Sequence, residues 1–488
     1  MIDKNSIYPI TNGVIAEYKN QQIPEYKGNP LIESLPNMME RDELIRSLGN
    51  YPSLSDEELS MSRLVRIHLV DRIYGLFQPL PIHIELEERI SKMIRQGYVW
   101  RNPFSKEIVE KYYEVYEALE RKDITKISEK HSVIPTVNSL SVIGVSGMGK
   151  SISIGKILNA YPQVIIHSEY KGVDYSQYQL VYLLVNAPHD GSIKGLCLDI
   201  ISKFDQYLGT DYYRKVANYA AVNSLLPLIC QISKRANLGA MIIDEIQVIS
   251  KAKSGGKDSF LNFFLTLVNS IGVSVILIGT SEAMSILRAH FRQSRRFTGK
   301  GEIIFNRIES HEHNEWVLFT KSLLRFRATQ IGVGDINGVS KALYHESQGI
   351  LDIAVKLYAM SQTEAIKNGS ERVTPELVSS VARTNLVTVR PAIEAIRSND
   401  IGALLDFEDI MPINYSSKNE SAVNKQDIKK PKDNAIDKGK QNNARKANNK
   451  IDLDELEEDD LRLIVGKGIG NEMKSYNTLV RSGIVKKI

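Results

Sequence analysis

Cysteine is scarce in this chain of 488 residues, which contains only Cys197 and Cys230, both in apolar helical contexts. This is neither a disulfide framework nor a zinc-binding spacing, and it fits a reducing cytoplasm. Long hydrophobic runs are also lacking: stretches such as VSVILIG (residues 273–279) fall far short of the ~20 residues that a membrane helix needs. The first ten residues, MIDKNSIYPI, lack a basic segment followed by an apolar one, so no signal peptide and no membrane partner is expected.

The chain also lacks a strong net charge, because 62 Lys and Arg residues nearly balance 58 Asp and Glu residues. Any binding of nucleic acid must therefore come from local basic patches. With 42% hydrophobic and 25% charged residues, the composition is ordinary for a soluble globular protein. The length predicts two or three domains, because single cores rarely grow past ~250–300 residues.

The N-terminal third divides into two parts. Residues 1–60 are rich in Pro, Asn, Gly and Tyr, which indicates an extended arm with little core of its own. Residues 61–135 show helical spacing of apolar residues and are expected to pack on the core. The helical pattern starts near residue 54, where Ser55 and Glu58 form a plausible capping box.

Short β-branched runs then alternate with helical segments, and this pattern predicts an α/β fold with a largely parallel sheet covered on both faces. We assign residues 136–308 to this core. After the run at 301–305 the strands are expected to stop, and residues 309–400 predict an all-helical lid. The expected strands lie at 139–146, 163–168, 179–187, 239–245, 273–281 and 301–305.

The C-terminal part has a different composition. Residues 401–450 are interpreted as a disordered basic linker, since 416–450 hold ten Lys or Arg against four Asp or Glu and almost no large apolar residues. Residues 451–488 begin with the acidic IDLDELEEDD and end with apolar residues. They form either a tethered docking peptide for a partner or a frayed tail.

The stretch GVSGMGKS follows a predicted strand, precedes a helical pattern and fits the phosphate-binding loop G-x-x-x-x-G-K-[ST]. Such a loop lets backbone N–H groups and a helix N-terminus surround phosphate oxygens. Lys150 would reach the β- and γ-phosphates of ATP, and the Ser151 hydroxyl would bind Mg²⁺. The predicted nucleotide-binding residues are Gly144, Val145, Ser146, Gly147, Met148, Gly149, Lys150 and Ser151.

Two acids end the apolar run AMIIDE. Asp244 at a strand end would hold Mg²⁺ together with Ser151, and Glu245 would polarise the attacking water. Alternatively, the two acids only cap the following helix. Thr280, or Ser281 beside it, ends another strand and could sense the γ-phosphate or orient water. ATP hydrolysis follows as a prediction, although a slow switch would carry the same residues as a fast motor.

Two basic segments follow these strand ends. In LRAHFRQSRRFTGK (residues 287–300), Arg295 or Arg296 is predicted to act as an arginine finger on a neighbouring subunit, unless the segment is a solvated helix end or contacts DNA. Lys251, Lys253 and Lys257 lie on a glycine-containing loop. These lysines could contact the phosphate backbone of duplex DNA, or they could simply be solvated. The H-x-H at 311–313 is typical of a polar loop rather than a metal site.

Taken in order, the P-loop, the DE strand, the polar strand end, SRRF and a helical lid resemble the AAA+ ATPases. The segments FQPLPIHIELEERISKMIRQGYVWRNP, MIIDEIQVISKAKSGGKDSFLNFFLTLVNSIGVSVILIGT and SQGILDIAVKL resemble TnsC, the ATP-dependent regulator of multi-component DNA transposons, with TniB as a relative. This resemblance covers roughly residues 28–400. It implies a homo-oligomer, ring or filament, that assembles on double-stranded DNA in its ATP state.

The resemblance further implies partners. The N-terminal region would meet a target-selecting DNA-binding protein and the C-terminal tail a transposase, with hydrolysis resetting the assembly. One departure concerns the lid: where many AAA+ lids carry an arginine, GILD places Asp352, and the first basic residue is Lys356. Two alternatives stay open, a replication initiator or helicase loader of the same fold, and a scaffold that binds ATP without hydrolysing it.

Overall fold

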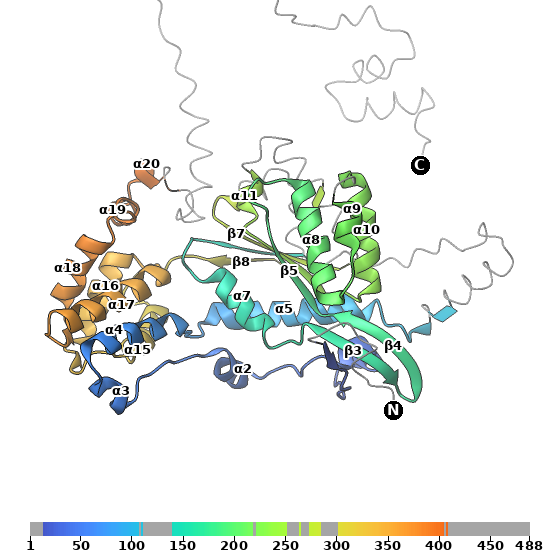
Figure 1. Cartoon of the computed structure of the whole chain (residues 1–488), viewed down its shortest axis with the longest axis horizontal. Helices are drawn as coiled ribbons and strands as arrows, with labels where there is room; N and C mark the ends of the chain where they lie inside the picture. Colours follow the sequence, from blue (N-terminus) through green and yellow to red (C-terminus); the bar gives the residue numbers. More distant parts are fainter. Residues whose placement is uncertain are drawn as a thin grey trace, which may run out of the picture. The chain divides into compact units, whose positions relative to one another are not determined.

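The computed structural model describes residues 13–106, 109–110, 139–217, 221–250, 263–264, 273–284, 301–404 and 407 (Figure 1). All of them belong to one compact unit, Met1–Lys425. Residues 111–135 of the region expected to be helical lie outside these ranges, as do nearly all of the linker and the whole C-terminal tail. Within the described ranges, no helix combines the length and apolar character needed to cross a membrane.

A five-stranded parallel sheet forms the centre of the fold, in the order β5-β6-β7-β2-β8. The predicted α/β class is thereby confirmed. All five strands are short and rich in Val, Ile and Leu, as expected for strands buried on both faces. They are β2 (Ser139–Gly144), β5 (Tyr182–Asn186), β6 (Ala240–Asp244), β7 (Ser274–Thr280) and β8 (Glu302–Phe305).

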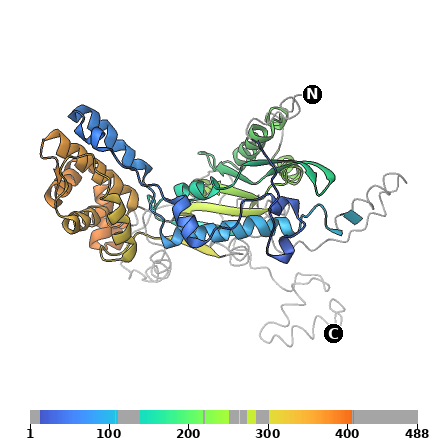
Figure 2. The same cartoon turned by 90° about the horizontal axis from the view of Figure 1, so that it is seen from below.

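Alternate side chains of these strands enter two separate cores. On β6, Ile242 belongs to one core and Ile243 to the other, and Ile276 and Leu277 on β7 divide in the same way. Helices therefore cover both faces, with α5 on one side and α8 and α10 on the other (Figure 2). These elements are α5 (Pro81–Val99), α7 (Lys150–Leu158), α8 (Ile193–Leu208), α9 (Tyr212–Val216), α10 (Val222–Arg235) and α11 (Gln247–Ser250).

Two of the expected strands are placed differently from the prediction. The run at 163–168 does not join the parallel sheet, and the run at 179–187 is split between two sheets. β3 (Val164–Tyr170) and β4 (Val173–Leu180) pair antiparallel, and β1 (Gly13–Ile15) adds to β3 to make a second, three-stranded sheet. Val181 separates β4 from β5, and its N–H donates to Gln163 O at 3.0 Å. Apolar character alone did not reveal this change of partner.

The N-terminal arm is more integrated than its composition indicates. Leu31, Ile32 and Leu35 are fully buried in the core to which Ile242 and Ile276 belong. The prediction of an extended arm with little core of its own is therefore corrected. The capping box of Ser55 and Glu58 is confirmed at the start of α3. The segment contains η2 (Pro24–Tyr26), α1 (Pro30–Glu33), α2 (Arg41–Leu48), α3 (Asp56–Ser60), α4 (Arg63–Leu69) and η3 (Val70–Gly75).

The region after β8 is helical, as predicted for the lid. Strands do not stop entirely, however, because the two-residue strands β9 (Gly332–Val333) and β10 (Arg372–Val373) pair parallel. A short helix, α20 (Ile401–Leu404), buries Leu404 and extends the folded region into the range assigned to the linker. The lid helices are α15 (Asn314–Leu323), α16 (Ile336–Ser347), α17 (Leu351–Lys367), α18 (Pro375–Asn385) and α19 (Arg390–Ser398).

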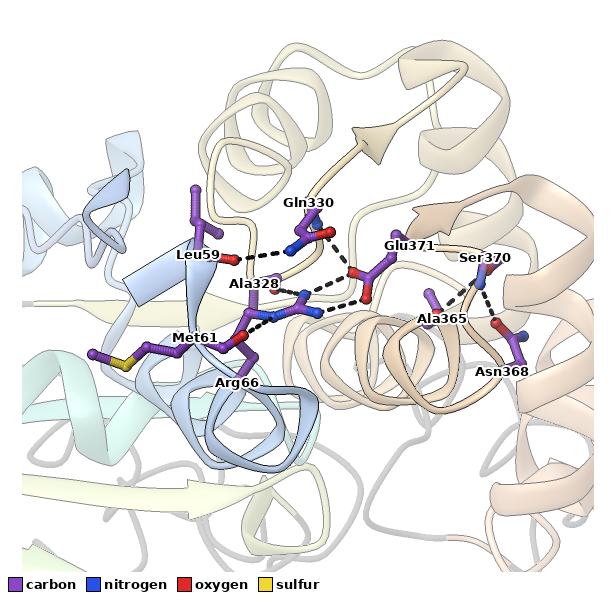
Figure 3. A network of polar contacts seen from close by, with 9 residues as sticks. All are labelled: Leu59, Met61, Arg66, Ala328, Gln330, Ala365, Asn368, Ser370 and Glu371. Atoms are coloured by element: carbon purple, nitrogen blue, oxygen red, sulfur yellow. Dashed lines mark hydrogen bonds and ion pairs between the residues drawn. The ribbon is translucent and has the colours of Figure 1, made fainter. Parts of the chain in front are cut away.

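One buried ion pair joins the N-terminal segment to the lid (Figure 3). The guanidinium of Arg66 on α4 donates to both carboxylate oxygens of Glu371, at 2.6 and 2.7 Å, and to Ala328 O at 2.9 Å. Glu371 also accepts from Gln330 N at 3.1 Å. Because the bidentate geometry satisfies both charges, the pair can be buried, and α4 is attached to the lid rather than to the sheet.

Candidate nucleotide-binding site

The P-loop connects β2 to α7, as the sequence predicts. Gly147 and Gly149 have φ of +79° and +84°, values that favour glycine. Gly149 is the N-cap of α7, and its carbonyl accepts from Ser153 N at 2.8 Å. The first N–H groups of a helix have no partner within it, so the loop ends at a helix terminus suited to a phosphate.

Close packing on either side fixes the loop. A Cβ on Gly144 would lie 2.1 Å from Phe305 O, the atom to which Val145 N donates at 2.9 Å. On the lid side, Asp352 N donates to Gly147 O at 3.0 Å. The loop is therefore held between β8 and the first turn of α17.

Lys150 occupies the first position of α7 and is 7% exposed. Its ammonium donates to Gly144 O at 2.9 Å and to Val145 O at 3.0 Å, so the side chain turns back beneath the loop. Ser151, the next residue, is exposed. A phosphate oxygen would compete with these two neutral carbonyls for the Lys150 ammonium, and its negative charge adds an ion-pair attraction that a carbonyl lacks.

The two acids lie at the carboxyl end of β6. Asp244 is 7% exposed, and one carboxylate oxygen accepts from Glu245 N at 2.7 Å. Glu245 is exposed and has a φ of +59°. This left-handed conformation costs roughly 1–2 kcal/mol in a residue other than glycine, and such strain is common at functional sites. In that bend, Asp244 is buried while Glu245 is exposed.

Thr280 ends β7, which lies between β6 and β2, and it pairs in register with Gly144 of the P-loop. The sheet therefore brings the P-loop, the two acids and Thr280 to one edge. Thr280 is 8% exposed, and among the described residues its hydroxyl and that of Ser281 are buried without a hydrogen-bond partner. Buried hydroxyls without partners are uncommon, and a ligand oxygen would satisfy them.

Comparison with known proteins agrees with this geometry. Residues 136–287 match the AAA domain family. The chain carries an AAA+ P-loop domain. No curated protein matches the chain.

Solved structures similar to the chain include the Walker-type ATPase PABY2304 of Pyrococcus abyssi, at 15% identity over 60% of this chain and 75% of that one, with a TM-score of 0.33. Cdc6p of Pyrobaculum aerophilum is 14% identical over 55% of this chain and 66% of its own, with a TM-score of 0.34. The structure of Drosophila ORC bound to DNA is 12% identical over 81% of this chain and 85% of its own, with a TM-score of 0.38.

The residues of the AAA+ domain fit a nucleotide with Mg²⁺. Ser151 and Asp244 supply the hydroxyl and carboxylate oxygens that Mg²⁺ prefers. The buried hydroxyl of Thr280, which has no hydrogen-bond partner among the described residues, could donate to a phosphate oxygen. Arg295, Arg296, Lys251, Lys253 and Lys257 lie outside the described residues, so the arginine finger and the DNA-binding loop stay predictions.

Next to the P-loop of the AAA+ domain is a cavity of about 280 Å³ that the sequence did not predict. Its lining combines the start of α5 (Leu80, Ile82, His83), Met148, residues 304–309 and the lid residues His313, Glu315 and Leu351. Its position beside Met148 makes it a candidate site for the nucleoside of a bound nucleotide. His313 also has a local role, since it is the N-cap of α15.

His83 in this cavity is a neutral residue with a defined tautomer. Leu80 N donates to its Nδ1 at 2.9 Å, so the proton of the neutral ring is on Nε2. Burial lowers the pKa of His83 to about 4, because the charged ring would lose its solvation. His83 therefore stays uncharged near neutral pH.

The lid meets the AAA+ domain where the sequence departs from the family pattern. Asp352 contacts the P-loop through its backbone, and its carboxylate accepts from Lys356 Nζ at 2.6 Å. Lys356 is thus paired with Asp352, and a second sensor at this position stays unassigned.

Sequence reasoning also missed Gln247. Its amide oxygen accepts from Thr280 N at 3.2 Å, and its amide nitrogen donates to a carboxylate oxygen of Glu245. The signal was the polar residue in IQVI, an otherwise apolar stretch directly after Asp244 and Glu245.

Proposed function

We propose that this protein is an ATP-dependent regulator of DNA transposition. It oligomerises on double-stranded DNA and links a target-selecting protein to a transposase, and ATP hydrolysis resets the assembly. The observation that supports the ATPase is the convergence of the P-loop, Asp244, Glu245 and Thr280 at one sheet edge. The TnsC resemblance of residues 28–400 supports the role in transposition.

Each side chain has a defined task in this proposal. The backbone of the P-loop and Lys150 bind the phosphates, while Ser151 and Asp244 would hold Mg²⁺, which screens phosphate charge when bound. Glu245 accepts a proton from the attacking water, and Thr280 orients that water or the γ-phosphate. Asp244 cannot easily exchange roles with Glu245, because it is buried and already accepts from Glu245 N.

The partner surfaces complete the proposal. Lys251, Lys253 and Lys257 contact the DNA backbone, and Arg295 or Arg296 reaches the nucleotide of a neighbouring subunit. The N-terminal region receives the target selector, and residues 451–488 receive the transposase.

Duplex-DNA binding and electron microscopy with ADP and with a non-hydrolysable ATP analogue test the switch. We expect rings or filaments on DNA only with the analogue, and none for Lys150→Ala. Equal assembly in ADP would refute the switch, and absence of duplex binding would refute the DNA role. Capture of a replicative helicase in place of a transposase would favour the initiator or loader alternative.

Changing Lys251, Lys253 and Lys257 together to Ala tests the DNA contact. Each phosphate contact that is lost should reduce the slope of log K against log salt by about 0.9, with nucleotide binding unchanged. The matched control changes three exposed lid lysines, Lys321, Lys341 and Lys367, to Ala. An equal loss of affinity in both variants would show a general effect of charge.

A further inference from the structure

Gln247 connects two parts of the candidate site that come from different strands. It opens α11 and is 8% exposed. Its Nε2 donates to Glu245 Oε2, and its Oε1 accepts from Thr280 N at 3.2 Å. One amide therefore joins the carboxylate after β6 to the backbone at the end of β7.

The surroundings hold this amide in place. A Cβ on Gly279 would lie 2.9 Å from Ile246 Cγ1 and 3.2 Å from Gln247 Oε1, so the approach of Gln247 to β7 leaves little room for a side chain there. Ile246 N donates to Ile278 O at 3.1 Å, which fixes the start of α11 against the same strand. The position of the Gln247 amide is thus set by the strand that carries Thr280.

Glu245 itself depends on such support. It is exposed, and its backbone has a φ of +59°, so packing does not fix its side chain. Its N–H is fixed by Asp244 Oδ1. The contact with Gln247 supplies the corresponding restraint on the carboxylate, and engages Oε2 while Oε1 can receive a proton.

We infer that Gln247 is the positioning residue of the ATPase site, which aligns the Glu245 carboxylate with the strand end at Thr280. This role rests on the proposed hydrolysis by Glu245. In this role Gln247 takes no proton and acts through Glu245. It limits the carboxylate to one orientation, and a misplacement of about 1 Å can cost on the order of 100-fold in rate.

Steady-state ATPase kinetics and a separate nucleotide-binding assay on the full chain test this role. Gln247→Met removes the hydrogen bonds to Glu245 and to Thr280 N at similar side-chain length. Gln247→Glu keeps the acceptor for Thr280 N but replaces the donor to Glu245 by a second carboxylate. We expect kcat to fall roughly 10- to 100-fold in both variants, with the KM for ATP within about twofold of wild type. The control is Gln163→Met, which removes a bond to Tyr182 O elsewhere in the same domain and should leave kcat unchanged.

A double-mutant cycle separates positioning from folding. In a Glu245→Gln background, Gln247→Met should cause no further loss of kcat, since no carboxylate remains to be aligned. Additive losses, or a loss of nucleotide affinity equal to the loss of kcat, would overturn the inference. Wild-type kcat in the Gln247 variants would also overturn it while leaving the ATPase intact. Wild-type protein that binds ATP but never turns it over would refute the proposed hydrolysis and this role together.

Discussion

Breaking the Arg66–Glu371 ion pair should lower the free energy of unfolding of the lid. Arg66→Met removes the donors to Glu371 and Ala328 but keeps the apolar stem, and it leaves a carboxylate that is only 10% exposed, held by Gln330 N. Glu371→Gln keeps the shape of the acceptor and leaves the Arg66 charge, 2% exposed, without its counter-charge. Removing one partner of a buried pair typically costs roughly 3–5 kcal/mol, because the other charge stays buried.

The two single changes should not add. Once Arg66→Met has removed the cation, Glu371→Gln removes the charge that was left uncompensated, so the double variant should be less destabilised than the sum of the singles by about 2 kcal/mol or more. The matched control is Arg390→Met. Arg390 Nε lies 2.7 Å from Glu394 Oε1, but both side chains of this pair are half exposed. Such a surface pair contributes about 0–1 kcal/mol.

Tryptophan fluorescence during urea unfolding measures the effect in the lid. The chain has two tryptophans, and Trp316 on α15 is fully buried whereas Trp100 is 59% exposed. In a Trp100→Phe background the signal reports Trp316 alone, with the change in midpoint multiplied by the slope giving the free energy. A cost below about 1 kcal/mol for both single variants, similar to that expected for Arg390→Met, would refute the reasoning from burial.

Three further outcomes follow from the structure. Gly147→Ala should weaken nucleotide binding measured by titration calorimetry and destabilise the protein by about 1–2 kcal/mol, since φ is +79° and the new Cβ would lie 2.9 Å from Ile350 Cγ2. Burial lowers the pKa values of His83 and His167 to about 4, so between pH 6.5 and 4 the unfolded chain binds more protons than the folded chain. As the pH is lowered through that window, the free energy of unfolding should fall by up to about 3 kcal/mol per histidine, and it should fall less steeply in His167→Gln. Burial also raises the pKa of Cys197 to about 12, so at pH 8 its thiol should react with a thiol reagent only after denaturation; rapid labelling of Cys197 in the native protein would contradict this.

Glu371 adds a pH dependence of its own. The hydrogen bonds from Arg66 lower the pKa of Glu371 below its usual value of 4.5. A depressed carboxylate pKa contributes stability that is complete above the unfolded value and is lost as pH falls through the folded one. The free energy of unfolding of the lid should therefore fall below about pH 4.5, and this contribution to acid sensitivity should disappear in Glu371→Gln.

The elements of the site that could be predicted from the sequence are those defined by local spacing. GVSGMGKS fixes a strand, a turn and a helix within a few residues, and the glycines at 147 and 149 adopt the left-handed conformations that such a turn requires. Asp244 and Thr280 were predictable because each ends an apolar run, and the carboxyl ends of parallel strands meet at one edge. Their roles in catalysis stay proposals.

Other features depend on contacts between distant segments, and no local pattern encodes them. The apolar stretch around Val181 reads as one strand, yet β4 pairs with β3 and β5 pairs with β6, so the two halves belong to different sheets. The Arg66–Glu371 pair and the amide of Gln247 likewise join residues whose proximity appears only in the folded chain. Arg66 and Gln247 each interrupt a short apolar stretch, and this was the available signal, without an indication of the partner.

The N-terminal segment contacts both the cavity beside the P-loop and the lid. Residues of α5 line the cavity beside the P-loop, while α4, which precedes α5 in the chain and is separated from it by η3, is attached to the lid through Arg66. The lid returns to the P-loop at Asp352 N. A ligand between Met148, His83 and Leu351 would therefore contact the P-loop, α5 and the lid at once. Because a ligand shifts a conformational equilibrium only through different contacts in its two states, the switch proposed above would act on the lid through this cavity and the P-loop.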